Sequence, residues 1–526
     1  MNQLDYQDVC KKLAEEIQSG IITSKSQLHH RKLQLSKENH LPKIVANADI
    51  LKVSPTEKVK KIVQRKPTRT ISGVAIIAVM TRPHSCPHGK CVYCPGGDTT
   101  PQSYTGREPA AMRAIQHEYN PYNQVHARLH QLHAIGHPTD KCELILMGGT
   151  LLSEDIDYQE HVVKQCFDAF NEKESLNVED ALELNEAAGN RVVGLTFETR
   201  PDWCKKQHIE RMLHWGGTRV EIGVQNLYDN IYTIVERGHT VNDVVLATQD
   251  AKDAGLKVGY HMMPGLPGSD IDKDLDAFER LFSDPQFRPD MIKIYPCQVL
   301  EGTKLYTWYK KGEYIPYSEE DLVELLVKMK QILPRYVRIM RMGRDIPSDL
   351  IVAGIKKTNI GQIVEKRLRD KGVVCECIRC REVGRNMLKG ITCDPDYITL
   401  VKRGYTASSG TEIFLSFEDT KNDLLIAFLR LRIPVVSWRP EIRDFAAVVR
   451  ELRVYGPVVP LGEEPVEEWQ HRGYGEDLLR EAEKLSSTFE KDTLVVLSGV
   501  GVKPYYKTLG YSRIGPYMGR DLHELG

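Results

Sequence analysis

Three cysteines close together in the sequence could bind an iron–sulfur cluster. Cys86, Cys91 and Cys94 lie in the segment CPHGKCVYC, and a glycine pair follows them. Three thiolates can hold three irons of a [4Fe–4S] cluster, and the fourth iron is then left without a protein ligand. The alternative is a zinc knuckle, to which His84 or His88 would add the fourth ligand. The spacing favours the cluster, whose open iron could bind a reactant directly.

A second cysteine group predicts a structural metal. Cys375, Cys377 and Cys380 lie within six residues of one another, a spacing tight enough to hold tetrahedral zinc with a fourth ligand from elsewhere in the chain. Three arginines surround this knuckle and indicate a further contact with nucleic acid: Arg379, Arg381 and Arg385.

Apolar runs of strand length recur after the first cysteines and must position them. They cover residues 74–80, 142–147, 192–198, 219–224, 257–263 and 291–296, with stretches of helical length between them. Strands separated in this way predict a parallel βα arrangement, either an open barrel or a doubly wound sheet. An amphipathic helix over 321–334 would close this α/β domain.

Both architectures place ligands at the carboxyl ends of the strands. The first cysteine group follows the first strand, and Gly148 and Gly149 follow the second. These glycines would let the backbone approach an amino-acid or nucleoside group. Glu198 and Arg200 end the third strand and could hold the ribose hydroxyls and carboxylate of that ligand, or form an ordinary ion pair.

The last 130 residues change character. Strand-like segments cover 412–417, 423–431 and 446–454, and QHRGYG at 470–475 opens a helix. Glycines at a helix start expose backbone N–H groups suited to pyrophosphate. A further strand at 494–497, with Tyr505 and Tyr506 beyond it, completes the order of elements of a coenzyme A-binding acetyltransferase domain.

The composition predicts a globular protein of the cytosol. The chain has 526 residues, a formal net charge of −1 and no long apolar run or secretory leader. Its cysteine usage fits a reducing compartment, with five cysteines expected to be ordinary buried residues: Cys10, Cys142, Cys166, Cys204 and Cys297. Residues 1–70 carry 14 Lys and Arg against 7 Asp and Glu, and residues 326–405 carry 18 against 8. These basic regions predict an anionic polymer as substrate, the alternative being solvated helix faces.

From about residue 67 onward the chain resembles the catalytic subunit family of Elongator, in its stand-alone archaeal or bacterial form. The segments that carry the resemblance are 86–97, 103–113, 375–384, 470–475 and 498–506. The family implies a radical S-adenosylmethionine (SAM) partial (βα)6 barrel joined to a GNAT-like α/β acetyltransferase domain. The expected division is a basic tRNA-binding helical region (1–70), the radical SAM domain (71–365), a zinc-binding linker (366–395) and the acetyl-CoA-binding domain (396–526).

The resemblance also implies a reaction. A 5′-deoxyadenosyl radical would take hydrogen from the acetyl methyl of acetyl-CoA, and the carbon radical would add to carbon 5 of the wobble uridine in the tRNA anticodon. Hydrolysis of the thioester would then release coenzyme A and leave the carboxymethyl group. Lys141 and Tyr506 are the implied catalytic residues. Acetyl-CoA contacts fall on Lys141, Glu451, Leu452, Arg453, Val454, Tyr474, Gly475, Glu476 and Tyr506.

The sequence departs from the family pattern at a few positions, and two alternative functions fit its motifs. Four residues separate Cys86 from Cys91, where radical SAM enzymes generally have three, and Arg453 and Arg472 replace residues of the eukaryotic relatives. A protein lysine acetyltransferase with a structural cluster, and an RNA-binding scaffold without catalysis, are the alternatives. Whether accessory subunits or a homodimer are needed stays open.

Overall fold

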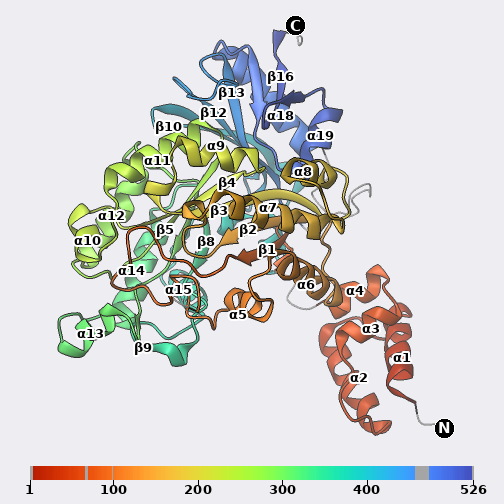
Figure 1. The fold of residues 1–526 in the computed structure, drawn as a ribbon. Coiled ribbons are helices and arrows are strands. Elements are labelled where there is room, and N and C mark those ends of the chain that lie inside the picture. The colour runs from red at the N-terminus through yellow and green to blue at the C-terminus, as the bar shows by residue number, and fades with distance from the viewer. Residues whose placement is uncertain (1–3, 65–68, 98, 457–472, 524–526) are drawn as a thin grey trace.

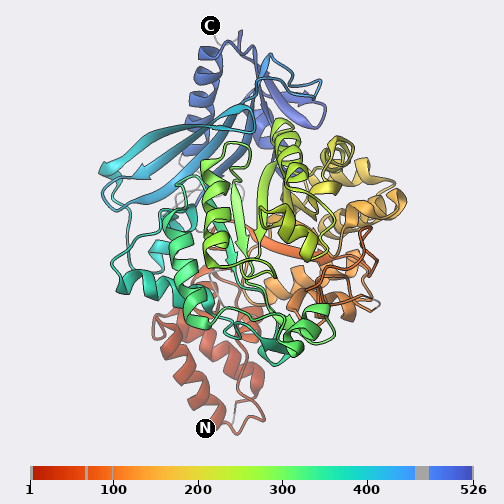
Figure 2. The same cartoon turned by 90° about the vertical axis from the view of Figure 1, so that its left-hand side faces the viewer.

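The computed structural model describes residues 4–64, 69–97, 99–456 and 473–523. The first four helices form a lobe with its own apolar core, centred on Val9, Leu13 and Leu35. Figures 1 and 2 place this lobe at the opposite end of the molecule from the C-terminal sheet. Short helices were expected here, and the structure has α1 (Tyr6–Gln18), α2 (Lys25–Glu38), α3 (Asn47–Val53) and α4 (Glu57–Val63).

The central domain is a half-barrel of parallel strands. Its order is β1-β2-β3-β4-β5-β6-β8, and each neighbouring pair is parallel. The six predicted strands are confirmed as β1 (Ala75–Met80), β2 (Lys141–Met147), β3 (Arg191–Thr199), β4 (Arg219–Gln225), β5 (Lys257–Met262) and β6 (Met291–Ile294). A further strand that the sequence analysis did not predict, β8 (Arg338–Met342), pairs with β6 and extends the sheet to seven strands. Two arginines interrupt the apolar residues of its sequence, RIMRM, so the strand has no continuous apolar run.

Helices cover the outer face of the half-barrel, as the crossovers of parallel strands require. The predicted helix at 321–334 is confirmed as α14 (Glu319–Gln331). The other covering helices are α5 (Pro109–Gln116), α6 (Pro121–Ala134), α7 (Ile156–Asn171), α8 (Val178–Asn185), α9 (Lys206–His214), α10 (Asp229–Ile234), α11 (Val241–Asp253), α12 (Ile271–Ser283), α13 (Lys304–Lys311) and α15 (Ile360–Asp370). A two-stranded ribbon pairs β7 (Val299–Leu300) with β9 (Ile351–Ala353).

The C-terminal domain is a second, mostly antiparallel sheet, and the predicted change of character is confirmed. Its order is β10-β11-β12-β13-β14-β16-β15. The predicted segments are β11 (Gly410–Asp419), β12 (Leu424–Ile433), β13 (Ala446–Val454) and β14 (Thr493–Val496), and the sequence reading missed β10 (Ile398–Ala407), β15 (Ser512–Ile514) and β16 (Tyr517–Asp521). Two helices, α16 (Ile378–Arg381) and α17 (Val383–Met387), precede the sheet in the chain. Helix α18 (Tyr474–Thr488) lies between β13 and β14 in the sequence, and α19 (Lys503–Thr508) lies between β14 and β15.

A buried ion network joins the two sheets. Arg450 on β13 contacts Asp290 at 2.6 Å and Glu412 at 2.7 Å, and all three side chains are at most 1% exposed. Arg432 on β12 extends the network to Asp253 at the end of α11, at 2.5 Å. Charges taken out of water in this way must be paired, so the contact between the domains fixes their mutual position.

The loop that follows β14 also packs directly against the half-barrel. A Cβ atom added at Gly499 would lie 2.2 Å from the backbone oxygen of Val193 on β3. Only glycine can therefore occupy this position without a shift of one domain. The acetyltransferase-like sheet and the half-barrel form one continuous body.

Candidate active site

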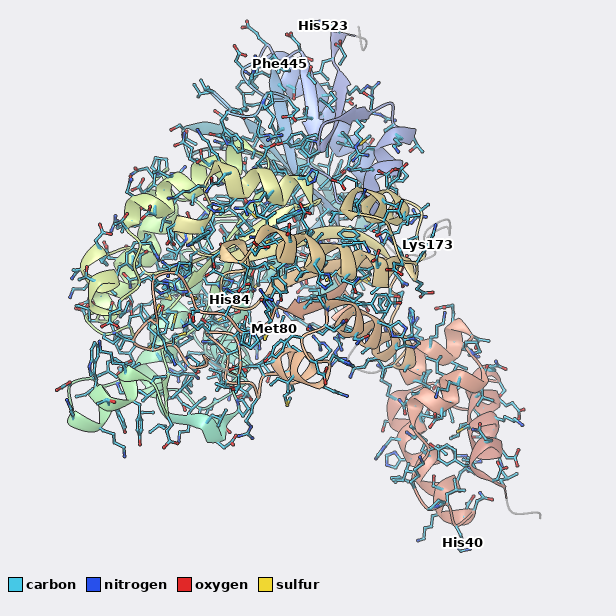
Figure 3. The ribbon with its side chains drawn as sticks, viewed as in Figure 1. His40, Met80, His84, Lys173, Phe445 and His523 are labelled. Carbon is cyan, nitrogen blue, oxygen red and sulfur yellow. The ribbon has the colours of Figure 1, made fainter. Side chains whose placement is uncertain are left out.

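The first cysteine group lines one cavity at the carboxyl ends of the barrel strands. The cavity has a volume of about 470 Å³, and Cys86, Cys91 and Cys94 all face it. Figure 3 marks Met80 and His84, which bracket the start of the loop that carries these cysteines. The sequence predicted this position from the strand that leads into the loop.

The spacing of these sulfur atoms fits a polynuclear cluster. Sulfur atoms around one zinc ion lie about 3.8 Å apart, because Zn–S bonds are about 2.3 Å long. Among the described residues, Cys86, Cys91 and Cys94 do not form a group with all sulfurs within 4.8 Å, whereas Cys375, Cys377 and Cys380 do. His84, one of the two histidines that could complete a zinc site, is engaged elsewhere, because its Nε2 accepts a hydrogen bond from the backbone N–H of Thr150 at 3.2 Å. The first group therefore fits a [4Fe–4S] cluster better than a zinc knuckle.

Hydrogen-bond donors surround the cysteine sulfurs. Arg237 Nη1 lies 3.6 Å from Cys91 Sγ, and His88 Nε2 lies 3.1 Å from the same atom. The backbone N–H of Ser103 donates to Cys94 Sγ at 3.1 Å. Burial, together with Arg200 and Arg237, lowers the pKa of His88 to about 3, so this imidazole is neutral. Donors of this kind stabilise thiolate ligands and tune the potential of a cluster.

The glycine pair after β2 packs against the cysteine loop. Gly148 and Gly149 have φ angles of +116° and +63°, and both line the cavity. A Cβ at Gly148 would lie 2.7 Å from Thr81 Oγ1, and one at Gly149 would lie 2.8 Å from His84 Cε1. The pair thus sets how closely the loop approaches β2, besides opening the backbone to a ligand.

Replacing Gly149 with alanine should lower the cluster content of the protein. The left-handed φ costs about 1–2 kcal/mol in a residue with a side chain, and the new methyl group would displace His84. Iron and sulfide per chain, measured after anaerobic reconstitution, test this. Gly189→Ala is the matched control, because a Cβ there meets nothing within 4 Å. Equal iron content in both variants would contradict the prediction.

The predicted SAM residues Glu198 and Arg200 both line the cavity, but they do not pair with each other. Glu198 accepts from Lys293 Nζ at 2.9 Å and from Tyr104 OH at 3.3 Å. Arg200 pairs with Asp202 at 2.9 Å. Each residue thus has an ion-pair partner that sequence reasoning missed, and its contact with SAM stays a prediction.

Charged side chains continue from this cavity through the barrel interior. Lys293 also pairs with Glu221, which contacts Arg219 at 3.3 Å, and Arg219 pairs with Glu143. All these groups come from strands whose other residues are mainly apolar. Charged residues at alternate positions of a buried strand are the sequence signal that could have revealed a polar lumen.

The chain of charges ends on the acetyltransferase-like domain. Arg453 on β13 lies 3.9 Å from Glu143 and donates to the backbone oxygen of Ser72 at 3.2 Å. Its predicted neighbour Glu451 pairs with Arg430 at 2.9 Å. The barrel interior thus connects the cysteine cavity with the strand that the sequence assigned to acetyl-CoA.

Most predicted acetyl-CoA residues come together at the start of α18. Leu452 and Val454 of β13 lie beside Gly475, and a Cβ there would meet their methyl groups at 3.9 Å. Tyr474 and Glu476 lie in the first turn of the same helix. Residues 470–472 of the predicted phosphate loop lie outside the described residues.

The two predicted catalytic residues occupy different surroundings. Lys141 is the first residue of β2 and is paired in register with Arg191, against which Gly501 of the C-terminal domain packs. Burial lowers its pKa. Tyr506 is 5% exposed and packs edge-on against Tyr505 and Tyr511. The hydroxyl of Tyr505, which sequence reasoning did not select, lies 3.2 Å from a Cβ built on Gly475.

Known proteins match this chain over nearly its whole length. The Radical SAM superfamily model matches residues 80–281, and the Radical_SAM C-terminal domain model matches residues 289–370. The tRNA uridine(34) acetyltransferase of Methanocaldococcus infernus is 52% identical over 489 residues, which cover 91% of each chain. Elongator complex protein 3 of Danio rerio is 40% identical and covers 98% of this chain and 96% of its own.

The chain belongs to the Elongator complex protein 3 family. A solved structure agrees: the archaeal Methanocaldococcus infernus Elp3 with residues 1–46 deleted is 48% identical, with a TM-score of 0.77, and covers 86% of this chain and 100% of that one. The resemblance predicted from the motifs is confirmed, as is the radical SAM half-barrel with a separate C-terminal sheet. Membership of the radical SAM superfamily implies a [4Fe–4S] cluster and SAM as cofactors.

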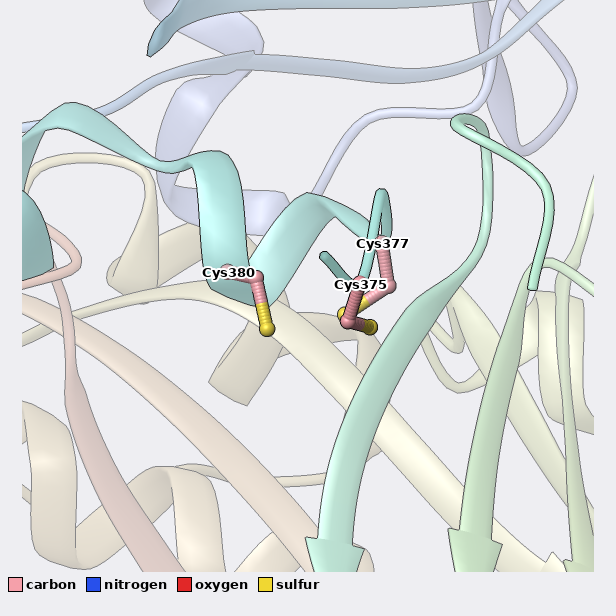
Figure 4. A group of neighbouring side chains, drawn as sticks. All are labelled: Cys375, Cys377 and Cys380. Carbon is pink, nitrogen blue, oxygen red and sulfur yellow. The ribbon is translucent and has the colours of Figure 1, made fainter. Parts of the chain in front are cut away.

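The second cysteine group of this Elongator family member lies between the two sheets (Figure 4). The sulfurs of Cys375, Cys377 and Cys380 lie within 4.8 Å of one another, and no fourth Cys, His, Asp or Glu among the described residues joins them. Lys330 Nζ lies 3.5 Å from Cys380 Sγ. Three thiolates at this spacing fit zinc, which stays a prediction.

Contact of the arginines around this knuckle with nucleic acid stays a prediction, and Arg379 and Arg381 are engaged within the chain. Arg381 is 2% exposed and pairs with Glu418 and with Asp423. Arg379 donates to the backbone oxygen of Met340 at 3.2 Å. These side chains are committed to the domain contact, because the knuckle packs on both sheets.

Loss of one knuckle thiolate should release the metal and destabilise the domain contact. Cys377→Ser is expected to lower bound zinc from one per chain to well below one, since a site with two thiolates binds zinc weakly. Elemental analysis and the thermal midpoint would be measured. Cys393→Ser serves as control, because Cys393 lies outside the described metal group. A zinc content unaffected by Cys377→Ser would refute the assignment.

The basic regions carry less free charge than their composition implied. In residues 326–405, Arg335, Arg338, Arg367, Arg381 and Arg403 all pair with carboxylates of the same chain. In the N-terminal lobe Lys58 and Lys61 stay exposed, while part of the basic run, residues 65–68, lies outside the described residues. Several basic residues of the lobe are also paired with carboxylates, so the binding of a polymer by either region stays a prediction. The structure also has no described helix long and apolar enough to cross a membrane.

The five cysteines expected to be ordinary are all buried and unpaired by disulfides: Cys10, Cys142, Cys166, Cys204 and Cys297. The proposed domain boundaries stay predictions. The first, between residues 70 and 71, follows shortly after residues 65–68, which lie outside the described part of the chain.

Proposed function

We propose that this protein attaches a carboxymethyl group to carbon 5 of the wobble uridine of tRNA, with SAM and acetyl-CoA as cosubstrates. The observation that carries the proposal is the polar barrel interior that links the cysteine cavity to β13. Two cosubstrates that react with one another must be brought together, and the ion pairs of Arg453, Glu143 and Arg219 extend from the strand proposed for acetyl-CoA toward the cysteine cavity. The names of the relatives, which specify uridine 34 of tRNA, support the substrate.

The chain's own residues would bind and orient the cosubstrates. Cys86, Cys91 and Cys94 would hold the cluster, which when bound and reduced supplies the electron that cleaves SAM to a 5′-deoxyadenosyl radical. Glu198 and Arg200 would fix the polar groups of SAM in the cavity they line. Gly148 and Gly149 leave the backbone of the cavity wall accessible.

The acetyltransferase-like domain would present acetyl-CoA. Backbone groups of Glu451–Val454 and the start of α18 would bind the pantetheine and pyrophosphate. Lys141 is placed where β2 meets the C-terminal domain, so it could contact the same molecule, and Tyr506 or its neighbour Tyr505 would lie near the thioester. A structural zinc at Cys375, Cys377 and Cys380 would hold the two domains together. A cytosolic location is part of the proposal and is supported by the cysteine usage of the chain.

The test is an anaerobic reconstitution. Protein, reductant, SAM, acetyl-CoA and tRNA with uridine 34 are incubated, and nucleosides are analysed by mass spectrometry. The proposal predicts 5-carboxymethyluridine together with 5′-deoxyadenosine, both dependent on acetyl-CoA. Acetylation of a lysine peptide without 5′-deoxyadenosine would support the acetyltransferase alternative. Binding of tRNA with no turnover of either cosubstrate would support the scaffold.

A further inference from the structure

Two arginines that the proposed reaction leaves unused enter the cavity from α5 and α6. Arg113 ends the sequence segment 103–113, for which no role has been given, and Arg128 lies in the middle of the next helix. Both line the same cavity as the three cysteines. The two guanidinium groups lie close enough to repel each other. Burial, together with the charge of Arg113, lowers the pKa of Arg128 to about 10.

Neither guanidinium has a carboxylate partner among the described residues. Arg113 Nη2 donates to the backbone oxygen of Ala78 at 2.9 Å, while its Nε is buried without a hydrogen-bond partner. Arg128 donates to the side chain of Gln131. Partly buried like charges without a counter-ion are unfavourable, so this pair favours an anion from outside the chain.

The carboxylates of the cavity cannot supply that counter-ion. Glu198 and Glu221 are paired with Lys293, and Asp345 is paired with Arg341. Glu108 accepts two hydrogen bonds from the backbone N–H of Thr105. The arginine pair therefore lacks a carboxylate partner among the described residues, as do Arg237 and Arg344 of the same cavity.

The location of the pair favours a polymer over a small cofactor. Arg113 bonds to β1, which is an edge strand of the half-barrel, so no further strand closes this side. The helix that carries Arg128 contacts α3 of the basic N-terminal lobe, and Arg69 adds to the positive field around Arg128. Positive charge thus leads from the lobe to the open side of the cavity.

We propose that Arg113 and Arg128 bind a backbone phosphate of the RNA next to the target nucleotide. Guanidinium groups match phosphate oxygens in geometry and charge. A phosphate held here would fix the unstacked nucleotide over the cavity, whereas the lobe would bind more distant phosphates. The assignment rests on the proposed function for the identity of the RNA, and it adds the residues that position it.

Binding of an anticodon stem-loop RNA tests the assignment without any turnover. Arg113→Gln and Arg128→Gln are each expected to weaken binding about tenfold and to reduce the salt dependence by about one phosphate contact. Lys273→Gln, which removes an exposed charge on α12, should have no such effect. The Michaelis constant for acetyl-CoA should stay unchanged in all three variants.

A neutral phosphate analogue separates contact from misfolding. Stem-loops with single methylphosphonate linkages around the uridine are titrated against the native protein and against Arg128→Gln. One linkage should weaken binding to the native protein about tenfold and have little further effect on the variant. Arg128→Lys, which keeps the charge, should restore part of the affinity.

Three outcomes would overturn the assignment. Unchanged RNA binding with a raised Michaelis constant for acetyl-CoA would mean that the pair binds a coenzyme phosphate. A raised constant for SAM alone would assign the pair to the SAM carboxylate. No effect on any ligand would leave a structural role at β1. Because the RNA titration needs no reaction, a failure of the proposed carboxymethylation would not be mistaken for any of these.

Discussion

Replacing Cys91 with alanine is expected to abolish the formation of both 5′-deoxyadenosine and carboxymethyluridine. Cys91 receives contacts from Arg237 and His88, so it is the best supported of the three sulfurs. With two ligands left, a [4Fe–4S] cluster is not retained, and SAM cleavage has no source of electrons. The loss should exceed 1,000-fold, roughly the range of removing an essential group. Both products would be measured by mass spectrometry beside the iron content.

The control for Cys91→Ala is Cys204→Ala, which removes a buried thiol outside both metal groups. It should keep the cluster and most of the activity, with only a modest loss of stability from the vacated volume. Acetyl-CoA binding to Cys91→Ala, followed by calorimetry, should match that of the native protein. Formation of both products by Cys91→Ala at the native rate would refute the assignment of Cys91 as an essential cluster ligand.

Replacing Arg450 with methionine is expected to destabilise the whole protein by about 3–5 kcal/mol, because Asp290 and Glu412 would lose a buried partner. The thermal midpoint should fall by roughly 3–5 °C for a protein of this size. Lys273→Met, which removes one partner of an exposed pair, should change stability by about 0–1 kcal/mol. Differential scanning calorimetry would compare the two variants. Equal midpoints would show that the network does not couple the domains.

The same network has a defined pH dependence. Although burial alone would raise the pKa of Asp290, Arg450, Lys252 and Arg430 lower it overall below its ordinary value. The stabilisation from this carboxylate is therefore complete above the unfolded pKa of about 4, and it is lost as the pH falls below that value. Native protein and Arg450→Met should differ most near neutral pH and converge in acid. A difference that grew with acidification would contradict this sign.

Much of the fold could be predicted from the sequence because its signals are local. The six strands before residue 297 are mainly apolar runs, since both faces of a parallel sheet are covered. Strand β8 was missed because its two arginines interrupt the apolar run. Strand β10 was missed because its residues are mostly partly buried or exposed, at the sheet edge. The order of elements and the cysteine motifs were enough to place the chain in its family.

The sequence by itself determined which residues could bind metals, since cysteine spacing along a loop is a local property. It also determined the half-barrel, because hydrophobic periodicity reports burial directly. Only the tertiary structure decided which charges are available. The arginines of residues 326–405 looked like an RNA-binding surface, and most are paired internally, whereas Arg113 and Arg128 looked ordinary and are left without a carboxylate. Ion pairing depends on residues far apart in the chain, so composition alone cannot distinguish a committed charge from a free one.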